Sequence, residues 1–303
     1  MRLPDFLIIG AMKAGTTSLY RDLLANPAVF MPHDKEPNSL TGDDVLTDAG
    51  RSKYARLFDR AGPHQVCGEA STTYTQLPDI TGVPARARKL LGERVRLIYL
   101  VRHPVERAIS HHHHILAGGH TNQGFDEALK HWPRFIDYSL YAMQVKAWLE
   151  HFPRENLLIV LFERYIRERR ATVESISRFL GVPADCSAID ADAAHNRTEG
   201  KPVAPGWARL LHDNVLYKRL VRDMLPTATR ERLKRLVSRR APARPPPPSL
   251  DVIRVMLDAF RPDAFELARL MGLSEPPWDL SEQWWKNRES ERGSRPRTAS
   301  ESG

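Results

Sequence analysis

Short apolar runs alternate with stretches of helical periodicity over the first 183 residues of this chain. The apolar runs lack the strict alternation of a half-exposed sheet, which is typical of strands that are buried on both faces. We expect these strands at Phe6–Ile9, Val66–Glu69, Arg96–Val101 and Leu157–Leu161. The helices expected between them lie near Leu19–Asn26, Val83–Leu91, Pro104–His114, Phe125–His131, Tyr141–His151 and Ala171–Leu180. Strands that alternate with helices predict an α/β fold, with a mostly parallel central sheet flanked by helices.

The pattern changes after Pro183, because a glycine and this proline end the last of these helices. We expect residues 1–183 to form an α/β core and residues 184–285 to form a helical C-terminal part of the same domain. The helices expected in that part are about Trp207–Met224, Thr229–Arg239 and Leu250–Met271. The proline-rich segment 241–249 predicts a stiff, extended spacer. The charged tail 286–303, rich in Ser and Arg, is predicted to be disordered.

The first predicted strand leads directly into a glycine-rich turn. From Gly10 to Ser18 the chain runs Gly-Ala-Met-Lys-Ala-Gly-Thr-Thr-Ser, and a helical segment follows. A strand, a glycine loop and a helix together surround a phosphate with backbone N–H groups. In a Walker A loop the lysine comes directly after the second glycine. Here Thr16 fills that place and Lys13 stands before Gly15, which argues against an ordinary ATPase or kinase. A P-loop kinase or NTPase remains an alternative.

A second candidate for anion binding follows the strand expected at Arg96–Val101. Arg102 comes directly after this strand, Pro104 can occupy the first turn of a helix, and Ser110 lies further along that helix. A guanidinium offers a phosphate a planar fork of donors, and a hydroxyl adds a directional hydrogen bond. On its own, the segment is better explained by a surface arginine and a solvent-facing serine. Together with the Lys13 loop, it indicates a site for a second phosphate.

These two segments together resemble the sulfotransferases that use 3′-phosphoadenosine-5′-phosphosulfate (PAPS), in particular their bacterial and Golgi heparan-type branch. The K-x-G-T-T sequence at Lys13 is similar to the 5′-phosphosulfate loop of that family. The R-x-P-x-x-R-x-x-S sequence at Arg102 is similar to its 3′-phosphate motif. Smaller segments that resemble the family are Lys35–Pro37, Gly68–Tyr74, Ser139–Tyr141 and the pattern near Phe260–Trp278. The main similarity spans about residues 5–183, and it implies a P-loop-like phosphosulfate-binding loop on the α/β core.

The resemblance implies a role for each matching residue, with PAPS as the sulfuryl donor. Lys13 would contact the 5′-phosphate and the bridging oxygen, and Glu36 would act as general base on the acceptor hydroxyl. His114 matches a second acid–base group of some family members. Arg102 and Ser110 would bind the 3′-phosphate. The residues implied to hold the nucleotide are Lys13, Ala14, Gly15, Thr16, Thr17, Ser18, Arg102, Ser110 and Tyr141.

The implied reaction is sulfuryl transfer to a hydroxyl, or an amine, of a carbohydrate, a glycolipid or a small-molecule acceptor. The chain departs from the family in three places. Asn38 and Ser39 replace the aromatic or histidine residues that are common after K-E-P in the family. Ala70 stands where many relatives carry a lysine near the sulfuryl group. The late K-G-R-type nucleotide contact has no clean counterpart, although Glu199–Lys201 lies in the corresponding region. The sequence does not select among the acceptors.

Composition and charge add further expectations. The chain has 303 residues, of which 42% are hydrophobic, and a net charge of +8. Basic residues are concentrated in Arg219–Arg244 and again in Arg288–Arg297. Such runs indicate a solvated helix face and a tail, or attraction to an anionic membrane surface or an acidic ligand. A non-catalytic protein that binds nucleotides or anionic surfaces is therefore a second alternative. Nucleic-acid binding is not expected, because neither interleaved aromatic residues nor zinc-ligand spacing accompanies these runs.

Cys67 and Cys186 are the only cysteines, which provides no disulfide framework and favours a reducing compartment. The apolar run Phe6–Ile9 is shorter than the roughly 7–15 residues of a signal-peptide core. We therefore expect a cytoplasmic protein, with peripheral membrane association left open.

The consecutive histidines His111–His114 suggest a metal site, but we expect no metal because sulfuryl transfer needs none and no nearby cysteine completes a ligand set.

Overall fold

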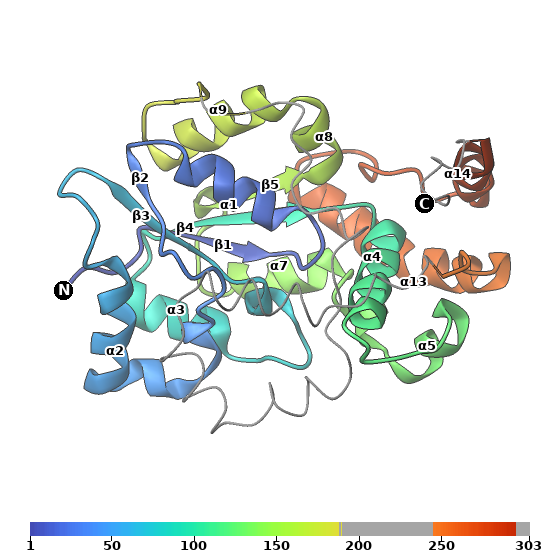
Figure 1. The fold of residues 1–303 in the computed structure, drawn as a ribbon, viewed down its shortest axis with the longest axis horizontal. Helices are drawn as coiled ribbons and strands as arrows, with labels where there is room; N and C mark the ends of the chain where they lie inside the picture. Colours follow the sequence, from blue (N-terminus) through green and yellow to red (C-terminus); the bar gives the residue numbers. More distant parts are fainter. Residues whose placement is uncertain (188, 190–244, 295–303) are drawn as a thin grey trace, which may run out of the picture.

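The computed structural model of the chain describes residues 1–187, 189 and 245–294 (Figure 1). A five-stranded sheet with the order β2-β3-β1-β4-β5 forms its centre, and every pair of neighbouring strands is parallel. The strands are β1 (Phe6–Gly10), β2 (Val29–Phe30), β3 (Val66–Ala70), β4 (Arg96–Val101) and β5 (Leu157–Leu161). The predicted α/β fold is confirmed. The sequence pattern did not predict β2, because a two-residue strand is too short to show a period.

Helices cover both faces of the sheet. Figure 1 shows α1 and α9 on one face, and α3 and α7 on the other. The helices are α1 (Thr16–Leu24), α2 (Asp48–Ala55), α3 (Val83–Leu91), α4 (Pro104–Ala117), α5 (Phe125–His131), α6 (Arg134–Asp137), α7 (Tyr141–Leu149), α8 (Phe162–Arg167), α9 (Arg169–Leu180), α13 (Leu250–Leu270) and α14 (Glu282–Ser294). Of these, α2, α6, α8 and α14 were not predicted.

The first strand lies at the centre of the hydrophobic core. Phe6, Leu7, Ile8 and Ile9 are all fully buried, as expected for a strand with neighbours on both sides and helices on both faces. The ring of Phe6 packs over Gly68 in β3, and a Cβ atom at Gly68 would lie only 2.0 Å from that ring. Glycine at this position therefore allows β1 and β3 to pair while the phenylalanine stays in the core.

Helix α13 joins the C-terminal part to the core. Its buried residues recur every three or four positions, which matches a single helix face: Ile253, Met256, Leu257, Phe260, Ala264, Leu267 and Ala268. This face packs mainly against α7. On α13, Asp263 caps the N-terminus of α7, because its carboxylate accepts hydrogen bonds from the N–H groups of Ala142 at 2.9 Å and Met143 at 3.0 Å.

The prediction of a disordered tail from residue 286 is wrong for residues 286–294, which belong to α14. The charged composition suggested disorder, but Trp285 is fully buried in the core and anchors this helix. The remaining residues 295–303 lie outside the described ranges, as do the predicted helices Trp207–Met224 and Thr229–Arg239. The described part of the proline-rich spacer, 245–249, has neither helix nor strand.

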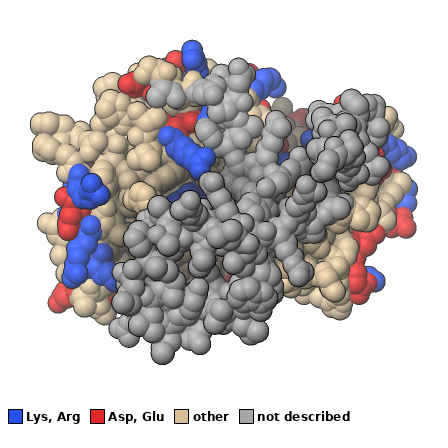
Figure 2. Space-filling view, viewed as in Figure 1, with Lys and Arg blue, Asp and Glu red and all other residues tan. Residues whose placement is uncertain are grey.

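Basic and acidic side chains are interspersed at both edges of the face shown in Figure 2, over the described residues. The basic run Arg219–Arg244 lies outside those residues, so membrane association through it stays a prediction. None of the helices within the described ranges combines the length and apolarity that a membrane span requires.

Candidate active site

Three neighbouring strands bring the predicted site residues to one edge of the sheet. β3, β1 and β4 lie side by side and run parallel, so their carboxyl ends share an edge. Lys13 follows β1 and Arg102 follows β4. The segment that contains Glu36 is attached to the end of β3, because the Glu36 N–H donates a hydrogen bond to the Ala70 carbonyl at 2.9 Å. This edge is where open α/β sheets bind their ligands.

The loop after β1 turns abruptly into α1. Gly15 adopts a φ of +92°, and a Cβ atom there would lie 2.6 Å from the ring of Phe162. Because glycine permits this turn, α1 begins at Thr16 and not near Leu19 as predicted. The first turn of α1 contains no acidic residue, so its N–H groups and the positive end of the helix dipole suit an anion.

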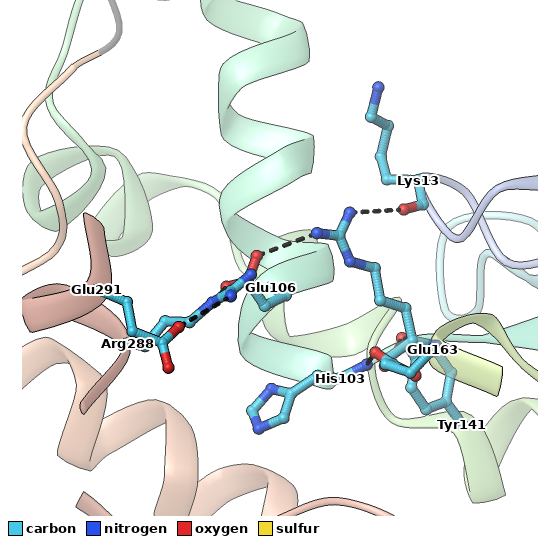
Figure 3. Close-up of polar contacts among 8 residues, drawn as sticks. Lys13, His103, Glu106, Tyr141, Glu163, Arg288 and Glu291 are labelled. Atoms are coloured by element: carbon cyan, nitrogen blue, oxygen red, sulfur yellow. Dashed lines mark hydrogen bonds and ion pairs between the residues drawn. The ribbon is translucent and has the colours of Figure 1, made fainter. Parts of the chain in front are cut away.

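Arg102 lies beside this loop. Its Nη1 atom is 3.5 Å from the Lys13 carbonyl oxygen, although the two residues are 89 positions apart in the chain. Its Nη2 atom donates to the Glu106 carboxylate at 3.0 Å, and its guanidinium lies 5.0 Å from the centre of the Phe162 ring. Figure 3 shows that the Lys13 carbonyl faces Arg102 while the lysine side chain points away from the guanidinium. The two segments predicted to bind phosphate therefore lie side by side.

Tyr141 holds the main chain of Arg102 through two hydrogen bonds. Its hydroxyl donates a hydrogen bond to the Arg102 carbonyl at 2.7 Å and accepts one from the Arg102 N–H at 3.3 Å. The side chain is almost completely buried, and this burial raises the pKa of the Tyr141 hydroxyl, which keeps it protonated. The structure thus gives Tyr141 a role in holding the end of β4. Its predicted contact with the nucleotide stays a prediction.

The loop that carries Glu36 is hydrogen-bonded to the segment that follows β3. Glu36 Oε1 lies 2.5 Å from Lys35 Nζ and accepts a hydrogen bond from the Thr72 hydroxyl at 3.3 Å. Further along, the Asn38 N–H donates to the Ser71 hydroxyl at 3.1 Å. Glu36 is 39% exposed, so its carboxylate is fixed by neighbours yet open to a substrate.

The family model of the sulfotransferase domain matches residues 3–203 of this chain. The chain belongs to the sulfotransferase domain family. Among curated proteins, it is 27% identical over 194 residues to heparan sulfate glucosamine 3-O-sulfotransferase 5 of Mus musculus, covering 60% of this chain and 54% of the relative. It is 28% identical over 211 residues to heparan sulfate glucosamine 3-O-sulfotransferase 3B1 of Homo sapiens, covering 66% and 51%. The chain thus spans about half the length of these relatives.

The fold is shared with a solved sulfotransferase. The crystal structure of a sulfotransferase from Alicyclobacillus acidocaldarius superimposes with a TM-score of 0.63 and 24% sequence identity, covering 90% of this chain and 97% of that one. This likeness concerns the fold, and its coverage extends beyond the α/β core.

Helix α4 of the sulfotransferase domain separates its histidines by burial. His114 is exposed in the last turn, and Ser110 is partly buried one turn before it. His111 is buried between Phe135 and Tyr138, and this burial, together with nearby Arg107, lowers the pKa of His111 to about 2. At least part of the histidine run therefore packs inside the protein. Within the described ranges, no three potential metal ligands lie together.

Sequence reasoning missed three residues that shape this site: Phe162, Glu106 and Arg288. A signal existed for the first two, because Phe162 directly follows a predicted strand and Glu106 lies one helical turn after Arg102. Arg288 lies 182 positions from its partner Glu106, in a segment whose composition indicated disorder. No local pattern reveals such a contact.

Proposed function

We propose that this protein transfers a sulfuryl group from PAPS to an acceptor hydroxyl. The observation that carries the proposal is the meeting of two anion-binding segments, the Lys13 loop and Arg102, at the carboxyl edge of the sheet. Membership of the sulfotransferase domain family supports the donor. PAPS carries phosphate at both its 5′ and 3′ positions, so it needs two such segments side by side.

The donor's 5′ side is assigned to the loop after β1. The N–H groups and hydroxyls from Ala14 to Ser18 bind the 5′-phosphate, at the positive end of α1. Arg102 and Ser110 bind the 3′-phosphate. The contacts of Arg102 to the Lys13 carbonyl and over the Phe162 ring support this assignment, because they hold the guanidinium next to the loop.

In this proposal the reaction is an in-line displacement at sulfur. The acceptor oxygen forms a new bond to sulfur while the bond from sulfur to the bridging oxygen of the donor breaks. The bridging oxygen leaves with the bonding electrons as part of adenosine 3′,5′-bisphosphate, and Lys13 stabilises the negative charge that develops there. Glu36 accepts the proton of the acceptor hydroxyl as general base. His114 serves as a second acid–base group.

We further propose a carbohydrate hydroxyl as the acceptor. The names of the curated relatives, which are glucosamine 3-O-sulfotransferases of heparan sulfate, support this class. Ala70 offers no charge near the sulfuryl group, so we assign part of the charge stabilisation to Lys35, whose ammonium lies against Glu36.

The test is calorimetric titration with adenosine 3′,5′-bisphosphate, with adenosine 5′-monophosphate and Mg·ATP as comparisons. We expect binding of the bisphosphate at micromolar concentration without magnesium, and clearly weaker binding of the monophosphate. A preference for Mg·ATP would indicate a kinase or NTPase and overturn the proposal. Radiolabelled sulfuryl transfer from PAPS to heparan-type oligosaccharides, glycolipids and simple alcohols then tests the acceptor class.

A further inference from the structure

A buried carboxylate connects Arg102 to the C-terminal helix α14. The side chain of Glu106 is only 9% exposed, and it accepts a hydrogen bond from an arginine on each side. Its Oε2 atom accepts from Arg102 Nη2 at 3.0 Å, and its Oε1 atom accepts from Arg288 Nε at 2.9 Å. Figure 3 shows Glu106 between the two guanidinium groups, with Glu291 on the far side of Arg288, 3.8 Å away.

Two tryptophans pack helix α14 against the core and so place Arg288 beside Glu106. Trp285 is fully buried, and the ring of Trp284 stacks on His103 with ring centres 3.7 Å apart and an angle of 9° between the planes. His103 is the residue after Arg102, and its Nε2 atom lies 3.0 Å from the carbonyl oxygen of Asp279. The segment before α14 and α14 itself therefore contact the imidazole ring of His103, the residue after Arg102, and the carboxylate of Glu106, which binds the Arg102 guanidinium.

The charges of this cluster bear directly on phosphate binding. A lone carboxylate against Arg102 would neutralise the guanidinium and compete with an incoming phosphate for its N–H donors. A second arginine bound to the same carboxylate offsets part of its negative charge. Arg102, Glu106 and Arg288 together carry one net positive charge, and the Arg102–Glu106 pair is mostly shielded from water, whereas Arg288 is 39% exposed and also faces Glu291 at 3.8 Å.

We propose that Arg288 is a positioning residue for the 3′-phosphate of the donor. It acts through Glu106, which it holds and partly neutralises, so that Arg102 keeps its orientation and its positive charge for the phosphate. This inference rests on the proposed assignment of Arg102 to the 3′-phosphate. It makes α14 a part of the donor site, and it gives the C-terminal helix a role in selecting nucleotides that carry a 3′-phosphate.

The experiment compares Arg288→Ala with wild type by titration with adenosine 3′,5′-bisphosphate and with adenosine 5′-monophosphate. We expect affinity for the bisphosphate to fall about five- to tenfold, which lies within the roughly 2- to 150-fold effects of residues coupled through a shared partner, while affinity for the monophosphate stays the same. The matched control is Lys286→Ala, which removes an exposed positive charge from the same helix and should change neither affinity. If the alanine variant fails to fold, Arg288→Gln provides the same comparison.

A rescue variant separates this role from a purely structural one. Adding Glu106→Gln to Arg288→Ala removes the carboxylate that competes for Arg102, and we expect it to restore most of the preference for the bisphosphate. A structural role for Arg288 would lower both affinities equally and would not be rescued, and that result overturns the inference.

Arg102→Ala distinguishes failure of this inference from failure of the proposed function. If Arg102→Ala loses the preference for the bisphosphate but Arg288→Ala keeps it, the proposed donor site stands and the role of Arg288 is wrong. If Arg102→Ala also keeps the preference, the assignment of Arg102 to the 3′-phosphate fails, and the inference fails with it.

Discussion

Lys13 and Glu36 share an unusual backbone conformation. Their φ angles are 72° and 62°, in the left-handed region that residues other than glycine seldom occupy, and Asn38 has a φ of 56°. Such residues each cost about 1–3 kcal/mol and are found mostly at functional sites. In each loop a residue to which we assign chemistry is strained, and in the Glu36 loop Asn38 is strained as well. The backbone geometry therefore supports Lys13 and Glu36 as the residues that act on the substrate.

Glu36→Gln should separate catalysis from nucleotide binding. The amide keeps the size of the side chain but cannot accept a proton, so we expect turnover to fall by about 10²–10⁴. Affinity for adenosine 3′,5′-bisphosphate should stay within about twofold of wild type, because the proposed phosphate contacts lie elsewhere. Sulfuryl transfer assays and calorimetry measure the two quantities. Turnover at the wild-type rate would show that Glu36 is not the base.

His103 should make stability depend on pH. Burial lowers the pKa of His103 to about 4, and its ring is almost completely inaccessible. Because the unfolded chain has a pKa near 6.5 at this residue, the neutral form contributes stability that is fully present above about pH 6.5 and is lost as the pH falls towards 4. The loss amounts to about 3 kcal/mol. Glu106 and Arg102, the charged groups nearby, act on this pKa in opposite directions.

The measurement is denaturant unfolding at pH 7 and at pH 4.5, for wild type and for His103→Phe. Phenylalanine can still stack on Trp284 but cannot bind a proton, so its free energy of unfolding should fall less on acidification. His64→Asn, which changes an exposed histidine, serves as the control and should follow wild type. Identical pH dependence in wild type and His103→Phe would contradict the lowered pKa.

At the scale of elements, α1 is held in place by a buried ion pair. Asp22 in α1 accepts hydrogen bonds from Arg169 in α9 through both carboxylate oxygens, at 2.7 Å and 2.8 Å. The two side chains are 4% and 7% exposed, and the Tyr165 hydroxyl donates a further bond to Asp22 at 2.5 Å. This contact fixes the helix whose first turn forms part of the proposed phosphate site.

Asp22→Ala should lower the free energy of unfolding by about 3–5 kcal/mol, because it removes the carboxylate from a buried, hydrogen-bonded ion pair with Arg169. The control is Arg164→Ala, which breaks an exposed pair with Glu168 and should cost at most about 1 kcal/mol. Chemical denaturation measures both variants. Equal effects of the two substitutions would mean that burial does not set the strength of the Asp22 pair.

At the scale of the whole molecule, the C-terminal helices complete the core. Helix α13 covers α7, and α7 in turn supports Arg102 through Tyr141. The C-terminal part is therefore joined to the donor site by continuous packing.

Phe260→Ala tests this dependence, because Phe260 is fully buried on the inner face of α13. We expect a loss of about 3–5 kcal/mol in the free energy of unfolding. Val255→Ala changes an exposed position of the same helix and should stay within about 0.5 kcal/mol of wild type. If Phe260→Ala were equally mild, α13 would contribute little to the stability of the core.

Much of the fold and of the site could be predicted from local sequence. The four longer strands begin where their apolar runs begin, and α3 and α5 have the predicted bounds. These elements were found because burial on both faces and glycine or proline at the ends leave local patterns. The loop at Lys13 and the segment at Arg102 were found because a strand, a turn and a helix follow one another directly in the chain.

The sequence by itself therefore determined the longer strands, most of the helices of the core, the fold class, and the residue types offered to two phosphates. Only the tertiary structure decided that β1 lies between β3 and β4, which brings Lys13, Glu36 and Arg102 to one edge. It also decided that Arg288 contacts Glu106 and that Trp285 is buried. The physical reason is the separation along the chain over which each effect acts. Periodicity and turn chemistry act over a few residues, whereas strand order and the burial of a distant helix depend on the packing of the whole chain.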